Sequence, residues 1–253
     1  MPHRIGIIGG SGVERPEAGY TETVVDTPYG PALAWIGEGE AADVVFLSRH
    51  GVEHDLPPHR VNYRANIKAL QLLGVDHVIA SFAVGGIADD IPPGGIVAPD
   101  QIIDLTNGRD FTFFDGGESS LKHTPFTEPF SPQLRVAIVA RGAAHGLAIR
   151  PTGTYVCFNG PRFETAAEIR MAKAFGADMV GMTAMPEAIL AREVEIHYAG
   201  IAVSVNWAAG VKGPLRVDFG ALESIRGKLL PLMLDVLRTT ELNADVWSRE
   251  SGD

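Results

Sequence analysis

Short apolar runs alternate with segments of helical periodicity along the whole chain, and this alternation predicts a layered α/β protein. The runs contain few polar residues on either face, which is typical of strands buried on both sides. Strands are expected at residues 5–8, 31–36, 44–48, 78–84, 154–158, 179–183 and 201–206. Helices are expected at residues 62–70, 132–145, 164–175 and 221–237. No repeat or linker interrupts the pattern, so we expect one domain over residues 1–253 with a frayed tail at 240–253.

The amino-acid composition narrows the range of possible functions. Acidic residues number 31 and basic residues 21, for a formal net charge of −10. This balance argues against sequence-independent binding to nucleic acid or to an anionic membrane. The single cysteine, Cys157, excludes an intrachain disulfide and a cysteine-based zinc cluster. Because we find neither an apolar stretch of about 18 residues nor a signal peptide, we expect a cytoplasmic protein without nucleic-acid or membrane partners.

Several of the expected strands end in, or run directly into, small or polar residues suited to binding an anion. They are Gly10-Ser11, Arg49-His50, Ala83, Thr183 and Asn206. Ligands of α/β sheets bind at the carboxyl ends of strands, so we expect these residues to face one cleft. An arginine binds phosphate oxygens in bidentate fashion, and a histidine donates to a third oxygen. The alternatives are that these are ordinary turn residues and that Arg49 pairs with a surface carboxylate.

Two other kinds of site fit the same region poorly. Gly9-Gly10-Ser11-Gly12 resembles the start of a dinucleotide-binding loop, but Arg15 stands where a third glycine is required, which disfavours an NAD oxidoreductase. His50, His54 and His59 are separated by glycine and proline residues that prevent a common helix face, and no carboxylate spacing completes the set. We therefore expect no metal site.

A series of motifs gives the chain a wider resemblance. In order they are Gly9-Gly10-Ser11-Gly12, Asp26-Thr27-Pro28-Tyr29-Gly30, Ser48-Arg49-His50-Gly51, Val61-Asn62-Tyr63-Arg64-Ala65-Asn66, Ala83-Val84-Gly85-Gly86, Asn159-Gly160-Pro161-Arg162-Phe163-Glu164-Thr165 and Gly181-Met182-Thr183-Ala184-Met185-Pro186-Glu187. In them the chain resembles the purine nucleoside phosphorylase and 5′-methylthioadenosine phosphorylase family, of the trimeric kind. The resemblance implies a single α/β domain with a central, mixed, partly barrel-like sheet flanked by helices. It also implies a homotrimer or hexamer.

The implied reaction is phosphorolysis of a purine nucleoside, a pentosyl transfer that yields free base and a ribose 1-phosphate. Inorganic phosphate is the co-substrate, and no cofactor is expected. Carried over position by position, the phosphate contacts are Ser11, Arg49, His50, the amide of Ala83, and Thr183. The nucleoside contacts are Met182 under the ribose, Glu164 and Asn206 at the purine, Phe163, and His123 reaching in from an adjacent subunit. We expect Asn206, Glu164 and His50 to be the catalytic groups.

The two purine-facing residues predict the base. An ionised Glu164 only accepts hydrogen bonds, so it suits the N1 proton of a 6-oxopurine and repels the N1 lone pair of adenine. The Asn206 amide donates to the 6-carbonyl and accepts from N7 as that nitrogen becomes protonated. We expect a preference for inosine, guanosine or 5′-methylthioinosine. A methylthioadenosine phosphorylase is the alternative, and a non-catalytic purine-binding protein is a remote one.

Two segments bear on the sugar and on assembly. Residues 207–222 contain no histidine to bind a 5′-hydroxyl; they offer Val211, Leu215, Val217, Phe219 and Leu222, an apolar set that favours a methylthio group. Residues 107–129 form a long aperiodic segment with four phenylalanines, at positions 111, 113, 114 and 126. Such a segment is usually functional. It docks either on a neighbouring subunit, as in the family trimer, or on its own core.

Overall fold

The computed structural model describes residues 4–10, 13–16, 18–51, 55–116 and 121–243 of the chain. The strands are β1 (Arg4–Gly9), β2 (Tyr20–Thr27), β3 (Gly30–Gly37), β4 (Val44–Ser48), β5 (Val75–Gly86), β6 (Ile96–Val97), β7 (Gln101–Asp104), β8 (Ile149–Arg150), β9 (Thr154–Cys157), β10 (Met179–Gly181) and β11 (His197–Trp207). The α-helices are α1 (Tyr63–Leu72), α2 (Pro132–Gly142), α3 (Ala166–Ala174), α4 (Ala184–Glu193) and α5 (Phe219–Thr239). None of the described helices has the length and apolar character needed to cross a membrane.

Strand β5 is the centre of the sheet, whose main path runs β2-β3-β4-β1-β5-β10-β9-β7. On one edge β5 pairs in parallel with β1 as far as Ala80 and then antiparallel with β10 from Gly85. On its other edge it pairs in parallel with β11, which continues to β6 and β8. The sheet therefore branches at β5, and the expected mixed sheet is confirmed.

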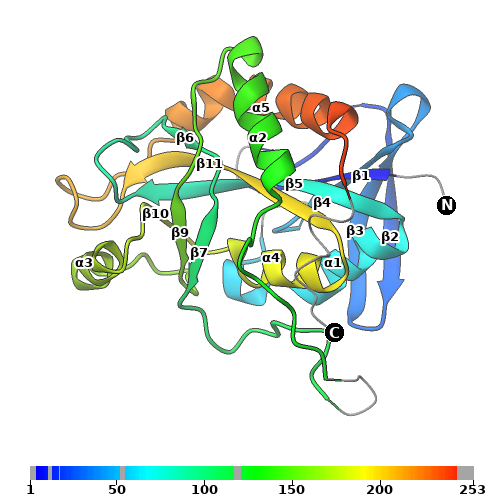
Figure 1. Cartoon of the computed structure of the whole chain (residues 1–253), viewed down its shortest axis with the longest axis horizontal. Coiled ribbons are helices and arrows are strands. Elements are labelled where there is room, and N and C mark those ends of the chain that lie inside the picture. The colour runs from blue at the N-terminus through cyan, green and yellow to red at the C-terminus, as the bar shows by residue number, and fades with distance from the viewer. Residues whose placement is uncertain (1–3, 11–12, 17, 52–54, 117–120, 244–253) are drawn as a thin grey trace.

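Helices cover both faces of this sheet (Figure 1). One hydrophobic cluster packs the strands against α1 and α4, and a second packs them against α2 and α5. Neighbouring strand residues alternate between the two clusters: Ile7 belongs to the α2–α5 side and Ile8 to the α1–α4 side. This alternation at a period of two explains why the central strands read as continuous apolar runs. Helix α3 packs separately, against Val156 and Val180.

The expected elements are present, but the pattern missed several. Strand β2 was missed because it is an edge strand with half of its residues exposed, and β6 and β8 because each has only two residues. Ala83 lies inside β5 and not after it, since β11 and β10 extend the pairing to Gly86. In the expected frayed tail, Leu242 packs against the α2–α5 cluster, and residues 244–253 lie outside the described part.

The long segment between β7 and α2 packs mainly on its own chain. Phe113 is buried, and Phe114 and Phe126 pack against the α1–α4 cluster. The Glu193 carboxylate accepts hydrogen bonds from the Thr112 hydroxyl at 2.6 Å and the Phe113 amide at 2.7 Å. Phe111 alone among the four phenylalanines is largely exposed, at 64%. Within one chain, three of the four phenylalanines thus have contacts with the protein's own core, and docking of the segment on a neighbouring subunit stays a prediction.

Candidate active site

A cavity of about 410 Å³ opens where β4, β5, β10 and β11 approach their carboxyl ends. The residues predicted from the sequence that line it are Arg49, His50, Ala83, Phe163, Glu164, Met182, Thr183 and Asn206. Ser11 lies outside the described residues. His123 is exposed and does not line the cavity of its own chain. The structure thus brings the candidate anion-binding and base-binding residues to one cavity.

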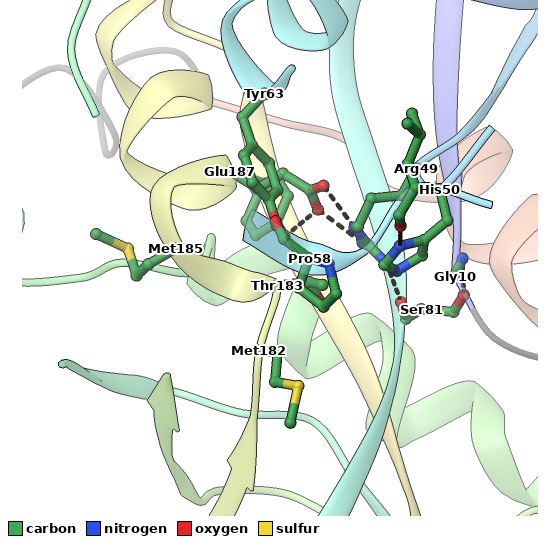
Figure 2. Close-up of polar contacts among 12 residues, drawn as sticks. Gly10, Arg49, His50, Pro58, Tyr63, Ser81, Met182, Thr183, Met185 and Glu187 are labelled. Atoms are coloured by element: carbon green, nitrogen blue, oxygen red, sulfur yellow. Dashed lines mark hydrogen bonds and ion pairs between the residues drawn. The ribbon is translucent and has the colours of Figure 1, made fainter. Parts of the chain in front are cut away.

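Arg49 is almost fully buried, with 1% of its side chain exposed, and its bidentate partner is a carboxylate of the protein (Figure 2). Its Nε and Nη2 donate to the two oxygens of Glu187 at 2.7 and 2.8 Å. Its Nη1 donates to the carbonyl oxygen of Ser81 at 2.9 Å. The edge of the guanidinium that was expected to bind phosphate in bidentate fashion is therefore occupied by Glu187. A guanidinium removed from water requires such an opposite charge. Two of the five N–H groups of an arginine remain for a ligand.

Glu187 is the residue that the sequence interpretation missed. The alternative interpretation paired Arg49 with a surface carboxylate, whereas its partner Glu187 is 1% exposed and lies in the first turn of α4. Tyr198 on β11 donates to the same carboxylate at 2.7 Å. Burial by itself lowers the pKa of Arg49, but the Glu187 carboxylate more than offsets this and the pKa is raised. We call Arg49, Ser81, Glu187 and Tyr198 the Arg49 cluster.

A gap in strand pairing supplies backbone donors next to this cluster. On the β1 edge of β5, pairing with β1 ends at Ala80 and pairing with β10 begins at Gly85. Ser81 directs its carbonyl to Arg49 across this gap. Alternate residues of a strand direct their N–H and C=O groups to the same edge, so the Ala83 amide faces the same side as the Ser81 carbonyl. The Gly10 amide is held there too, donating to the Ser81 hydroxyl at 2.9 Å.

Thr183 and His50 complete the polar side of the cavity. Thr183 is the N-cap residue of α4, but its side chain makes no capping bond, and its amide donates to the Tyr155 hydroxyl at 3.3 Å. The Thr183 hydroxyl is therefore not used by the helix. The Nδ1 of His50 lies 2.7 Å from the Leu56 carbonyl and donates to it as N–H. This bond fixes the tautomer, so Nε2 carries a proton only in the charged ring.

Glu164 and Asn206, which we call the Glu164 pair, lie on another part of the same cavity. Glu164 is 7% exposed, and its Oε1 is buried with no hydrogen-bond partner among the described residues. Burial raises the pKa of this carboxyl. Asn206 is 3% exposed and uses one N–H on the Trp207 carbonyl, at 2.8 Å. A buried polar atom without a partner is unusual in a native protein, and this one belongs to a residue that lines the cavity.

Part of the apolar lining of the cavity comes from a segment that was not expected. Leu56, Pro57 and Pro58 line the cavity together with Val217. Among the expected set, Val211 packs beside α3 and Leu222 is buried against the α2–α5 side. Leu215 does not line the cavity, and the side chain of Phe219 lies outside the described part. An apolar wall is present, and among the expected residues whose side chains the structure describes, Val217 alone contributes to it.

The expectation of no metal site concerned His50, His54 and His59. Across the described ranges, no group of three histidine, cysteine or carboxylate side chains is close enough together to hold a metal ion. His54 lies outside those ranges. Cys157 is buried, and burial raises the pKa of its thiol to about 12, so it is a poor nucleophile.

Comparison with known proteins agrees with this geometry. The model of the phosphorylase superfamily matches residues 4–226. The chain is 50% identical over 219 residues to the 6-oxopurine nucleoside phosphorylase of Pyrococcus furiosus, covering 84% of this chain and 82% of the relative. It is 48% identical over 218 residues to a probable S-methyl-5′-thioinosine phosphorylase of Thermodesulfovibrio yellowstonii, covering 85% and 82%. The structure of methylthioadenosine phosphorylase from Schistosoma mansoni with tubercidin superposes with a TM-score of 0.84 at 32% identity, covering 93% and 90%.

These matches define the class: the chain belongs to the phosphorylase superfamily. Within it, the chain is a nucleoside phosphorylase and therefore a pentosyltransferase. The family resemblance, the fold class and the reaction class expected from the sequence are confirmed. The roles of the individual cavity residues stay predictions.

Proposed function

We propose that this protein cleaves 6-oxopurine nucleosides by phosphorolysis, with Glu164 selecting the base. One observation carries the proposal: Glu164 lines the same cavity as Arg49 and Thr183, and its buried Oε1 has no hydrogen-bond partner among the described residues. A carboxylate oxygen in that position accepts the N1 proton of hypoxanthine or guanine. Adenine has only a lone pair at N1, so it leaves the carboxylate unsatisfied and faces it with a second acceptor.

In this proposal phosphate binds beside the Arg49 cluster. The remaining N–H groups of Arg49, the Ala83 amide, the Thr183 hydroxyl and His50 surround it, and Ser11 adds a hydroxyl. Glu187 keeps the guanidinium charged and fixed before phosphate arrives. No cofactor is needed, because phosphate is itself the nucleophile.

The chemistry then requires no covalent enzyme intermediate. The bond between the sugar carbon and N9 lengthens, and the sugar acquires oxocarbenium character. Bound phosphate lies on the opposite face and attacks that carbon, forming ribose 1-phosphate. The departing purine gains negative charge, which is stabilised by a proton taken up from solvent at N7, whose N–H donates to the Asn206 amide oxygen, and by a hydrogen bond from the remaining Asn206 N–H to the 6-carbonyl. Met182 lies beneath the sugar and Phe163 beside the base.

The apolar wall formed by Leu56, Pro57, Pro58 and Val217 supports a methylthio group at the sugar 5′ position. Such a wall discriminates a methylthio group from a hydroxyl by only about 10–200-fold, so both 5′-methylthioinosine and inosine are expected to react. The names of the similar proteins cover both substrates. Methylthioadenosine is the second candidate on the strength of the structural neighbour, but Glu164 opposes it.

We further propose that the active form is a homotrimer or a hexamer. His123 is exposed in the single chain and so is the side chain of Phe111, at 64%. In an assembly, His123 would reach the sugar site of a neighbour. Light scattering at low protein concentration tests the assembly, and His123→Ala tests the contact through the KM for nucleoside. A cytoplasmic location also stays a prediction.

The test of the reaction is an assay of inosine and 5′-methylthioinosine with and without phosphate. Hypoxanthine and the sugar 1-phosphate are expected in equal amounts, and only when phosphate is present. Release of hypoxanthine at the same rate in phosphate-free buffer would contradict phosphorolysis. The matched variant is Glu164→Ser combined with Asn206→Asp, which is expected to shift the preference toward adenine nucleosides because it removes both 6-oxopurine contacts.

A further inference from the structure

Arg109 lies outside the cavity lining but contacts the backbone of two loops that form it. It belongs to the long segment between β7 and α2. Its Nη2 donates to the carbonyl oxygens of Asn159 at 2.9 Å and Met182 at 2.8 Å. Its Nη1 donates to the Met185 carbonyl and, at 3.3 Å, to the Tyr63 hydroxyl. One side chain thus uses four N–H groups on acceptors from three separate parts of the chain.

Two of these carbonyls, those of Met182 and Met185, lie in an irregular turn at the start of α4, where the helix does not supply them with N–H donors. Thr183 is the N-cap of α4, and Met185 has non-helical angles of φ −112° and ψ 137°. Carbonyls at such a break do not enter the hydrogen-bond ladder of the helix and require another donor. Arg109 donates to both the Met182 and the Met185 carbonyl, and the Cys157 thiol adds a weaker bond to Met185 at 3.8 Å. Arg109 therefore holds the turn that presents the Met182 side chain and the Thr183 hydroxyl to the cavity.

The third carbonyl belongs to the loop that leads to the base-binding residues. Asn159 precedes Gly160, and Pro161, Phe163 and Glu164 line the cavity just beyond it. Gly160 has φ +58°, and a Cβ there would lie 2.4 Å from the Met182 sulfur, so the two loops are in direct contact. Arg109 also joins the two loops by donating to a carbonyl of each, at backbone positions other than the Gly160–Met182 contact. The guanidinium therefore adds to the links that set the relative position of Met182 and Glu164, beyond the end of the β9–β10 pairing, where the Phe158 amide donates to the Gly181 carbonyl at 2.9 Å.

The surroundings of Arg109 indicate a positioning role and not a salt bridge. None of the ion pairs found between described residues involves Arg109, and its Nε has no partner among those residues. Its charge is balanced by carbonyl dipoles and by the Tyr63 ring, whose centroid is 5.3 Å away. An arginine offers a rigid planar fork with donors on both terminal nitrogens. A lysine places one ammonium at one point and cannot reach all four acceptors.

We propose that Arg109 is a positioning residue for nucleoside cleavage, which fixes the spacing between the sugar-contacting turn at Met182 and the base-contacting loop at Glu164. The inference rests on the proposed function, because it takes these two loops to hold the nucleoside. Displacement of a reacting group by about 1 Å lowers the rate of an enzyme about 100-fold. Arg109→Ala is therefore expected to lower kcat/KM for inosine by about that factor.

Arg64 provides a matched control. It lies on α1 and anchors the same long segment through Asp110 at 2.7 Å and Asp115 at 3.0 Å, but it does not line the cavity. Arg64→Ala and Arg109→Ala both remove an arginine that holds this segment. Only Arg109 contacts the carbonyls of the site. Because partly exposed ion pairs contribute little, Arg64→Ala is expected to keep kcat/KM within about threefold of the wild type.

The experiment measures kcat and KM for inosine and for phosphate in the wild type, Arg64→Ala, Arg109→Ala and Arg109→Lys. In Arg109→Ala, kcat should fall and the KM for inosine rise, while the KM for phosphate changes less because Arg49 and His50 lie on other elements. Arg109→Lys should recover part of the loss. Millimolar guanidinium ion should restore activity to Arg109→Ala and leave Arg64→Ala unchanged, since it replaces the missing donors.

The outcomes separate the inference from the proposed function. A wild type that releases no hypoxanthine overturns both. With an active wild type, the inference alone is overturned if Arg109→Ala stays within about threefold of it, if Arg64→Ala loses as much activity, or if guanidinium restores nothing. Should Arg109→Ala fail to fold, Arg109→Lys carries the test: a kcat/KM lowered at least about tenfold supports the inference, and an unchanged value overturns it.

Discussion

Arg49 lines the same cavity as the Glu164 pair, yet the charged groups of the Arg49 cluster and of the pair are satisfied to very different degrees. In the cluster, Arg49 and Glu187 are each 1% exposed and satisfy one another in bidentate fashion, with Ser81 and Tyr198 adding further bonds. In the pair, Glu164 keeps a buried oxygen without a partner among the described residues. In the first arrangement the opposite charges are paired before any ligand binds. The second is completed only by a ligand that brings a donor.

This difference fits the two tasks proposed for the cavity. Phosphate is common to every substrate, so its site benefits from a charge that is fixed in advance. The base must be chosen, and an unsatisfied acceptor chooses by penalising any base without a matching proton. Stability is therefore expected to depend on the Arg49 cluster, and specificity on the Glu164 pair.

The largest effect is expected from Glu187→Ala. It leaves the buried guanidinium of Arg49 without a counter-charge, and breaking a buried pair in this way lowers the free energy of unfolding by about 3–5 kcal/mol. Urea denaturation measures it. Asp43→Ala is the control, because Asp43 also makes a bidentate pair, with Arg238, but at about 40% exposure. That variant should lose at most about 1 kcal/mol. Equal losses in the two variants would contradict the comparison.

A smaller effect, confined to activity, is expected from Glu164→Ala. Loss of the N1 contact should lower kcat/KM for inosine about 100-fold, because a buried donor of the substrate is left unpaired. The free energy of unfolding should stay the same or rise, since the variant removes a carboxylate whose burial is uncompensated. Parallel kinetic and denaturation measurements test this. A loss of stability comparable to that of Glu187→Ala would remove the distinction between the two groups.

The smallest effect is a pH dependence of stability that comes from Glu164. Burial raises its pKa above the ordinary value of 4.5. The folded protein therefore retains a proton over a pH range in which the unfolded chain has released it, so this contribution to stability is lost as the pH rises from 4.5 through the folded pKa. The stability of Glu164→Gln relative to the wild type should increase over that range. A difference that does not vary with pH would show that the carboxyl is not desolvated.

The same contrast explains how much the sequence alone could predict. The central strands were predicted because apolar runs buried on both faces leave a clear pattern, whereas the exposed edge strand β2 leaves little. Arg49, Thr183 and Asn206 were predicted to share a cleft because they follow strand ends, and they do. Glu187 was missed, since its partner is 138 residues away in the chain and a carboxylate in a first helical turn reads as a cap.

Arg109 was missed for a related reason. Its acceptors are backbone carbonyls at Asn159, Met182 and Met185, and a carbonyl has no sequence identity. The motif Asn159-Gly160-Pro161 was recognised, but its contact with Met182 depends on the positive φ of Gly160 and on the folded chain. The sequence pattern therefore does not predict contacts that distant segments make through their backbone.

The most direct test of the account is a competition in one tube, with equal concentrations of 5′-methylthioinosine and 5′-methylthioadenosine in the presence of phosphate. The two substrates share a sugar and differ only at the edge of the base that Glu164 and Asn206 are proposed to contact. Because adenine would leave two buried hydrogen bonds mismatched, the initial rate of hypoxanthine release is expected to exceed that of adenine release by about 100-fold or more. Adenine released as fast as hypoxanthine, or faster, would contradict the central claim that the unpaired carboxylate selects the base.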